Sequence, residues 1–171
     1  MDKTGPTIVV NVPYYPGNLG KAYNDFMGRL GPEEWACFLD HDAMFTTGDW
    51  YGQMCEIINK HPSAGLFTAV TNAVYPKWQC VKMGYAHDVK KHRMLGSDLL
   101  LSKRTQTKPC RGRLSGVVIL TSRRAWEKSG GFQDGFMGVD NAYHTAVAKA
   151  GYDVLLMEGL YVYHWYRGIE T

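Results

Sequence analysis

The sequence predicts an α/β fold, in which one domain has a mostly parallel sheet flanked by helices. The first observation is the alternation of apolar, β-branched runs with amphipathic stretches over residues 7–71. Such an order places the strands in one direction and the helices on the faces of the sheet. The second is size, because 171 residues, 45% of them hydrophobic, are enough for one core. We also find no internal repeat, low-complexity segment or interdomain linker, so residues 1–171 are expected to form a single domain.

The first two elements are a strand and a helix. Residues 7–12 are predicted to form the strand, because they are rich in β-branched side chains and lie between Pro6 and Pro13. A loop follows, and Asn18 is a suitable N-cap for a helix that ends at Gly31. The apolar residues of this helix recur at helical spacing: Leu19, Ala22, Tyr23, Phe26, Met27 and Leu30.

Residues 35–39 are an apolar run that leads directly into Asp40 and Asp42, which predicts a buried strand with two carboxylates at its end. Ligands of open α/β sheets bind just outside the carboxyl ends of such strands. If the chain stays extended, the two carboxylates point to the same side, about 6–7 Å apart. They then suit a hard divalent cation with a diphosphate bound beside it. The alternative is that both acids only begin a turn after the strand.

The following elements continue the alternation. A helix begins after Asp49 and stops near His61, and a strand is expected at residues 65–71. Further strands are expected at residues 115–120, 153–157 and 160–167, and further helices at residues 123–128 and 139–150.

Residues 72–114 differ from the rest, because basic and aromatic residues are mixed there with few periodic signals, apart from a helix around residues 88–101. One interpretation is a basic loop over an anionic ligand, and the other is a solvated surface insertion. His87 and Asp88 resemble a metal-phosphohydrolase signature. Those enzymes resemble all-helical domains, so the alternation of strands and helices argues against that function.

The composition disfavours several classes of partner. A net charge of +3 is too small to favour nucleic acid or an anionic membrane. We find no signal peptide and no apolar run long enough to span a bilayer. The four cysteines show no C-x-x-C spacing, which favours reduced thiols over a disulfide framework, so a cytoplasmic location is expected.

Three parts of this chain resemble the GT-A glycosyltransferases, and most of all their family-two, inverting group. Residues 38–42 look like the D-x-D strand of that family, and residues 18–24 before it resemble its N-x-G-x-A-x-N helix start. Residues 130–140 are similar to the family's G-G-F-D-E…E-D segment. Residues 151–164 resemble its ending, in which a histidine follows the last strand.

The resemblance implies a Rossmann-like GT-A domain in a shortened form. Residues 7–71 would be the nucleotide and metal half, residues 72–114 an acceptor or lid region, and residues 115–167 the acceptor and catalytic half. The nucleotide-binding half is trimmed relative to the family. Two positions depart from the family pattern, since Val139 stands where Glu is usual and Tyr23 where Arg is usual.

The resemblance also implies an enzyme that moves a sugar from a nucleoside diphosphate sugar to an acceptor hydroxyl, with inversion. A UDP-sugar is the expected donor, and a divalent ion, Mn²⁺ in preference to Mg²⁺, would neutralise the leaving diphosphate. Asp40, Asp42 and His164 are the expected metal ligands, with Asp40 also near the ribose. Asp140 is the expected general base, and Asp134 is a weaker candidate.

Further contacts are expected around these residues. The nucleotide is expected to meet Pro13, Tyr14, Tyr15, Lys21 and Arg167 together with Asp40 and Asp42. Weaker candidates for contact with the acceptor or the diphosphate are Trp78, Arg93 and Arg113. The sequence assigns neither the acceptor nor the oligomeric state. Two other classes stay open: a metal-dependent nucleotidyltransferase, which would release pyrophosphate, and a non-catalytic sugar- or nucleotide-binding domain.

Overall fold

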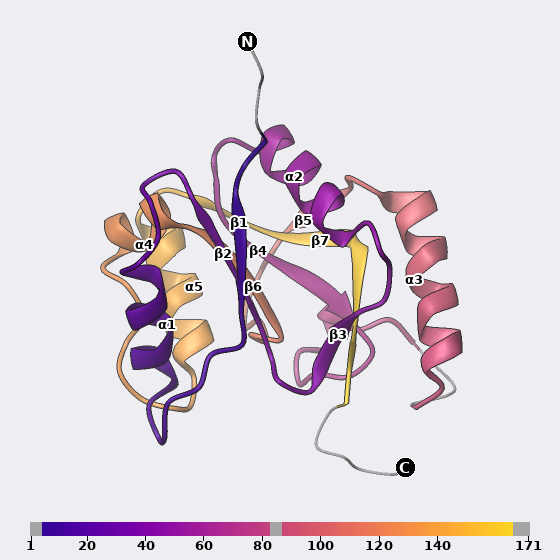
Figure 1. Ribbon diagram of the computed structural model, residues 1–171, viewed down its shortest axis with the longest axis horizontal. Coiled ribbons are helices and arrows are strands. Elements are labelled where there is room, and N and C mark those ends of the chain that lie inside the picture. The colour runs from indigo at the N-terminus through magenta and orange to yellow at the C-terminus, as the bar shows by residue number, and fades with distance from the viewer. Residues whose placement is uncertain (1–4, 83–86, 166–171) are drawn as a thin grey trace.

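The computed structural model describes residues 5–82 and 87–165, which form a sheet with helices on both sides (Figure 1). In chain order the elements are β1 (Ile8–Asn11), α1 (Leu19–Met27), β2 (Trp35–Leu39), β3 (Ala43–Phe45), α2 (Trp50–Lys60), β4 (Ala64–Thr71), the 3₁₀ helix η1 (Lys77–Gln79), α3 (Val89–Lys103), β5 (Thr107–Pro109), β6 (Val118–Ser122), α4 (Arg123–Ser129), α5 (Val139–Lys149) and β7 (Asp153–His164). Among the described residues the sheet has seven strands, in the spatial order β1-β2-β6-β4-β7-β3, with β5 paired to β7.

The sheet is mixed, so the prediction of a mostly parallel sheet was wrong. β1 pairs with β2 and β4 pairs with β7 in parallel, but β6 lies between β2 and β4 and is antiparallel to both. The short strands β3 and β5 are antiparallel to β7. The alternation of strands and helices did place β1, β2 and β4 in one direction. The prediction failed on which strands are neighbours, because β6, which comes later in the chain, lies between β2 and β4.

Most predicted elements are present, with small shifts at their ends. β2 has the predicted bounds, and the Asn18 side chain caps α1 by accepting a hydrogen bond of 2.9 Å from the Lys21 N–H. Asp49 makes no such side-chain bond at α2; it forms an ion pair with Arg104 instead. β3 and β5 were not predicted, since three-residue strands carry no periodic signal. The two predicted C-terminal strands are one strand, β7.

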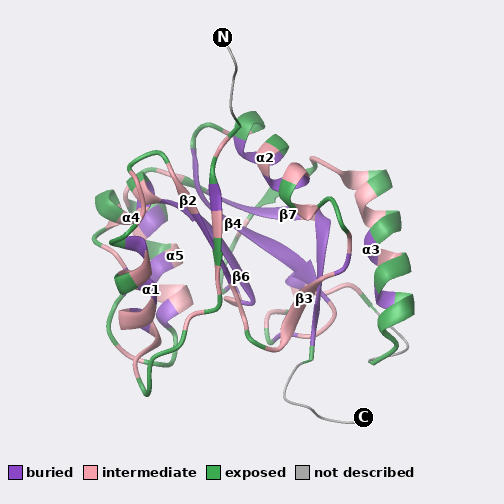
Figure 2. Cartoon of the chain, in the orientation of Figure 1, coloured by how far each residue is buried: buried purple, intermediate pink, exposed green. Residues whose placement is uncertain are grey.

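The core has one layer on each face of the sheet. On one face α2 packs through Met54 and Ile57, which are fully buried. On the other face α1 and α5 pack through an aromatic stack, in which the Phe132 ring lies 4.5 Å from the Tyr23 ring and 3.7 Å from the Tyr143 ring. Figure 2 shows β4 and β7 buried between these layers. The aromatic stack supports the loops that carry the candidate site.

Two further features concern the chain as a whole. In the part of the chain that the structure describes, no helix combines the length and the hydrophobicity needed to cross a membrane. The four cysteines, Cys37, Cys55, Cys80 and Cys110, are free thiols.

Candidate active site

Three predicted metal ligands lie together at one end of the sheet. The Nε2 atom of His164 is 3.2 Å from Asp42 Oδ1 and 3.9 Å from Asp40 Oδ2. One donor atom from each residue lies within 4.8 Å of the others. The two carboxylates are not on an extended run, as the sequence suggested, because the Ala43 N–H donates to Asp40 O (3.1 Å) and closes a turn after β2. The turn nevertheless brings both acids to the histidine.

The pairing of β3 with β7 explains why residues so far apart in sequence meet. Ala43, the first residue of β3, is the register partner of His164 at the end of β7. The Trp165 N–H extends this pairing by donating to Asp42 O at 2.9 Å. β3 is short, but it fixes the acidic turn against the histidine.

The segment after β4 orients His164. Its Nδ1 atom is 2.7 Å from the carbonyl oxygen of Ala73, and because a carbonyl only accepts, Nδ1 carries the proton. The lone pair of a neutral imidazole is then on Nε2, on the side of the two carboxylates. Asn72 holds the backbone of His164 on both sides: its Oδ1 accepts from the His164 N–H (2.8 Å) and its Nδ2 donates to His164 O (3.0 Å). Such outer contacts are typical of metal-binding histidines.

The electrostatics of this cluster fit a bound cation. Burial raises the pKa of the Asp40 carboxyl to about 6; the neighbouring Asp42 adds to this shift, and His164 opposes it. Within the described residues, neither carboxylate forms an ion pair with a lysine or arginine. Two carboxylates and an imidazole lone pair that face one another repel unless a cation lies between them. Oxygen ligands with one imidazole suit Mn²⁺ or Mg²⁺, and the imidazole favours Mn²⁺.

Asp140 lies in the first turn of α5 and its carboxylate is anchored. Its Oδ2 accepts from the Gly116 N–H (2.9 Å) and its Oδ1 from the Asn141 N–H (2.8 Å). An added Cβ on Gly116 would lie 3.1 Å from the Asp140 Cβ, a contact tighter than most, so glycine eases the close approach. The next residue, Val117, accepts from the Asp40 N–H (3.1 Å). The same short segment therefore holds both Asp140 and Asp40.

Tyr23 is a buried tyrosine of α1. Its side chain is 2% exposed and packs between the Phe38 and Phe132 rings. Burial raises its pKa, and the charges of Asp40 and Asp140 raise it further. Tyr23 therefore stays a neutral phenol.

Two segments that resemble family motifs are hydrogen-bonded to each other. One is residues 18–24, which include the start of α1, and the other is residues 131–135. The Gly20 N–H donates to Gly135 O (3.1 Å), and Asn18 Oδ1 accepts from the Gly135 N–H (2.9 Å). A Cβ on Gly20 would lie 1.8 Å from the carbonyl oxygen of Gln133, so only glycine allows this contact. These contacts hold the loop before Asp140 against the start of α1.

Three asparagines each bind both backbone polar groups of one distant residue. Asn24 binds Phe132 (2.9 and 2.8 Å), Asn72 binds His164, and Asn141 binds Leu114 (3.1 and 3.0 Å). Sequence reasoning did not single out Asn72 or Asn141. Only their positions in the sequence could have identified these two residues, since Asn72 directly follows a buried strand and Asn141 directly follows the candidate base.

The expected nucleotide contacts lie on the loop after β1 and on α1. Tyr14 is 84% exposed, Tyr15 is also exposed, and Pro13 is half-buried. Lys21 Nζ is 2.7 Å from an Asp25 oxygen and 5.2 Å from the centre of the Tyr15 ring. None of these side chains has a described contact with the three clustered metal-ligand candidates. Arg167 lies outside the described residues.

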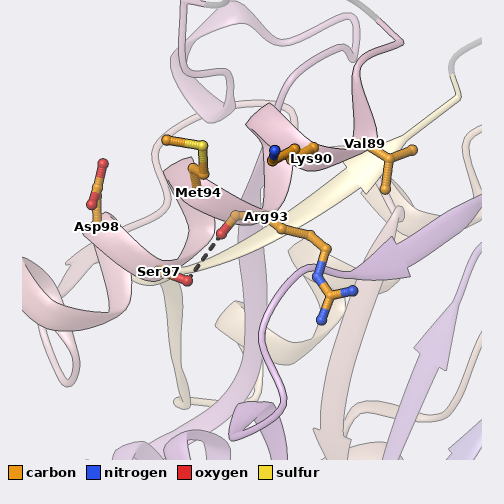
Figure 3. A pocket seen from close by; sticks show the side chains of 6 residues that line it. All are labelled: Val89, Lys90, Arg93, Met94, Ser97 and Asp98. Carbon is orange, nitrogen blue, oxygen red and sulfur yellow. Dashed lines mark hydrogen bonds between the residues drawn. The ribbon is translucent and has the colours of Figure 1, made fainter.

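The weaker candidates lie in three places. Trp78 Nε1 donates to Arg113 O (2.9 Å), so these two lie side by side. Asp134 is exposed and accepts from Asn18 Nδ2 (3.3 Å). Arg93 is on the outer surface of α3, where a hollow of about 590 Å³ is lined by that helix only (Figure 3). The lining residues of this hollow are Val89, Lys90, Arg93, Met94, Ser97 and Asp98, and none belongs to the clustered site.

Comparison with known proteins finds likenesses among solved structures. No protein-family model matches the sequence, and no curated protein matches it. A solved structure that is similar is the mannosyltransferase PcManGT from Pyrobaculum calidifontis in complex with GDP-Man and Mn²⁺, with a TM-score of 0.53 and 17% sequence identity. The match covers 85% of this chain and 35% of the mannosyltransferase, so the chain spans about a third of that protein's length. The likeness shows that the chain shares the fold of the matched part of the mannosyltransferase.

Proposed function

We propose that this protein is a metal-dependent glycosyltransferase, which moves a sugar from a nucleoside diphosphate sugar to an acceptor hydroxyl. The single observation that carries the proposal is the convergence of Asp40, Asp42 and His164 within a glycosyltransferase fold. The donor set, the imidazole lone pair facing it and the absence of a described lysine or arginine partner all favour a divalent cation there.

In this proposal Asp42 and His164 bind the metal ion directly, and Asp40 contributes a second carboxylate, either to the ion or to the ribose. The ion stabilises the negative charge that develops on the departing diphosphate. Asn72 and Ala73 keep the histidine in the tautomer and orientation that this role requires.

Asp140 is the proposed general base. Each carboxylate oxygen has two lone pairs, so Asp140 can accept a further hydrogen bond from the acceptor hydroxyl while it holds Gly116 and Asn141. It takes the proton as the hydroxyl oxygen attacks the anomeric carbon and the bond to the diphosphate breaks. One displacement of this kind inverts the anomeric centre.

For the donor we propose a nucleoside diphosphate sugar, without naming the base. The mannosyltransferase with the similar fold was solved with GDP-Man, so the expected UDP-sugar gains no support from it. We propose that Tyr14 and Tyr15 contact the base and that residues 7–71 form the donor half of the site. Residues 115–167 would form the acceptor and catalytic half, and Arg167 is proposed to contact the nucleotide.

A thermal-shift screen tests the donor site. GDP, UDP and other nucleoside diphosphates would be added with Mn²⁺ or with a chelator, and one nucleotide should raise the melting temperature only with Mn²⁺. The Asp42→Ala and His164→Ala variants should lose this response. No metal-dependent stabilisation by any nucleotide would contradict the proposal.

Product analysis then separates the possible activities. A glycosyltransferase releases a nucleoside diphosphate, whereas a nucleotidyltransferase with the same acidic pair releases pyrophosphate. Metal-dependent nucleotide binding without turnover across donors and acceptors would indicate a non-catalytic binding domain instead.

A further inference from the structure

A second hollow, of about 650 Å³, lies between α5 and the segment before β6. Its lining residues are Gly112, Arg113, Asn141, His144, Thr145, Ala148 and Lys149. Two of these residues carry a full positive charge and none is acidic. The lining therefore has a net positive charge, as an anion-binding site requires.

The two positive charges are not neutralised within the described chain. Arg113 and Lys149 are both exposed, and neither forms an ion pair with any described carboxylate. Other basic residues do find acids, for example Arg104, which binds Asp49 and Glu56. His144 is half-buried, and burial lowers its pKa although Asp140 opposes the shift. It adds a neutral hydrogen-bonding group between the two cations.

The walls of this hollow are fixed in place. Asn141 binds both the N–H and the C=O of Leu114, which follows Arg113. On the outer side, Trp78 Nε1 donates to the carbonyl oxygen of Arg113. These bonds tie the backbone of the basic segment to α5 and to Trp78, so the walls of the hollow are in place, while the Arg113 and Lys149 side chains are exposed.

The hollow adjoins the candidate base. Asp140 and His144 are one turn apart on the same face of α5. Asn141, which lines the hollow, also donates from its Nδ2 to Asp140 Oδ1 (3.1 Å). Lys149 is nine residues beyond Asp140, about 13 Å along the helix axis and on the opposite side of the helix at about 100° per residue. A ligand bound at Asp140 can therefore extend past Asn141 and His144 into the hollow, toward Lys149 at its far end.

We propose that this pocket binds a negatively charged group of the acceptor, a phosphate or a carboxylate. The charge would lie beyond His144, more than about 6 Å along α5 from the hydroxyl that Asp140 deprotonates. The inference rests on the proposed function, because it takes Asp140 as the place where the acceptor hydroxyl binds. The donor diphosphate has its own partner in the metal cluster, so a second anion site is fitted to the acceptor.

The test measures binding of small acceptor mimics in the absence of donor and metal. Glucose 6-phosphate, glucuronate and glucose would be titrated into the protein, with binding followed by nuclear magnetic resonance shifts. Arg113→Gln, Lys149→Gln and the double variant remove the charges. Arg29→Gln is the matched control, because Arg29 is an exposed cation that follows α1 and lines no part of the pocket.

We expect the anionic sugars to bind more tightly than glucose, and each pocket variant to lose about tenfold in their affinity, as for a charge-assisted hydrogen bond. The control should bind like the unaltered protein, and melting temperatures should stay the same because both side chains are exposed. A preference for glucose 6-phosphate would indicate a phosphorylated acceptor, and a preference for glucuronate an acidic sugar. Equal binding of glucose and the anions, no binding of any of them, or full anion affinity in the double variant would overturn the proposal.

This measurement also separates the pocket from the proposed function. If the anionic sugars bind as expected but no sugar transfer is found, the pocket stands and the glycosyltransferase proposal fails. If transfer occurs while the pocket variants bind and transfer normally, the proposed function stands and the anionic acceptor is refuted.

Discussion

Replacing Asn72 by alanine should impair metal binding although Asn72 is not a ligand in the proposed site. Its amide bonds the His164 N–H at 2.8 Å and the His164 C=O at 3.0 Å, directly after β4. Alanine removes both bonds and leaves the two backbone groups without these partners. His164 would lose the support that keeps its Nε2 atom beside Asp42.

The size of the effect follows from these two hydrogen bonds. At about 1 kcal/mol each, Asn72→Ala should lower the free energy of unfolding by about 1–3 kcal/mol. Loss of an outer-shell partner of a metal-binding histidine typically weakens metal affinity by about 10- to 100-fold. The Mn²⁺ affinity of Asn72→Ala should therefore fall within that range.

Calorimetric titration with Mn²⁺, together with urea denaturation, measures both effects. Asn141→Ala is the matched control, since Asn141 bonds the N–H and C=O of Leu114 in the same way, and its further bond, from Nδ2 to Asp140 Oδ1, is to the candidate base and not to a candidate metal ligand. Both variants should lose similar stability, and only Asn72→Ala should lose Mn²⁺ affinity. If the two variants bind Mn²⁺ equally well, Asn72 has no role in positioning the metal ligand.

Three further substitutions test the proposed roles separately. His164→Ala should weaken Mn²⁺ binding by more than tenfold in calorimetry while the circular dichroism spectrum stays native; unchanged affinity would remove His164 from the ligand set. Asp140→Asn should retain Mn²⁺-dependent nucleotide binding and lower the single-turnover transfer rate by about 10²- to 10⁴-fold, the usual contribution of a general base; a normal rate would refute that role. Gly116→Ala puts a methyl group 3.1 Å from the Asp140 Cβ, so it should cost about 1–3 kcal/mol of stability in urea denaturation and slow transfer, with Mn²⁺ affinity retained. Wild-type stability in Gly116→Ala would show that the segment adapts easily.

The sequence predicted those parts of the fold that depend on local patterns. The apolar run of β2 and the Asn18 cap were identified because their signals lie within a few residues. The directions of neighbouring strands relative to each other were not predicted. β6 lies between β2 and β4 in the sheet, although it follows β4 in the chain by more than forty residues, about the length of the basic region. β3 was missed for a related reason, since three residues become a strand only through their pairing with β7.

The candidate site shows the same division. Asp40 and Asp42 were singled out by residue type and position, and Asp140 and His164 through the family resemblance. What the sequence could not give was the geometry: the acids lie in a turn, and β3 carries that turn to the histidine. Asn72 and Asn141 were missed because an isolated amide has no sequence pattern of its own. Its value depends on which backbone groups come within reach.

The three asparagines explain how loops can hold a site with the accuracy of a sheet. A loop residue leaves its own N–H and C=O without ladder partners, and those groups must be satisfied when buried. The amide of asparagine has one acceptor and two donors on a short stem, so it can bond both groups of one residue as a neighbouring strand would. Asn24 does this for Phe132, Asn72 for His164 and Asn141 for Leu114. The loop before the candidate base, the candidate metal ligand His164 and the segment beside Gly116 are each held in this way. In the proposed site these three amides therefore position the groups that would carry out the chemistry.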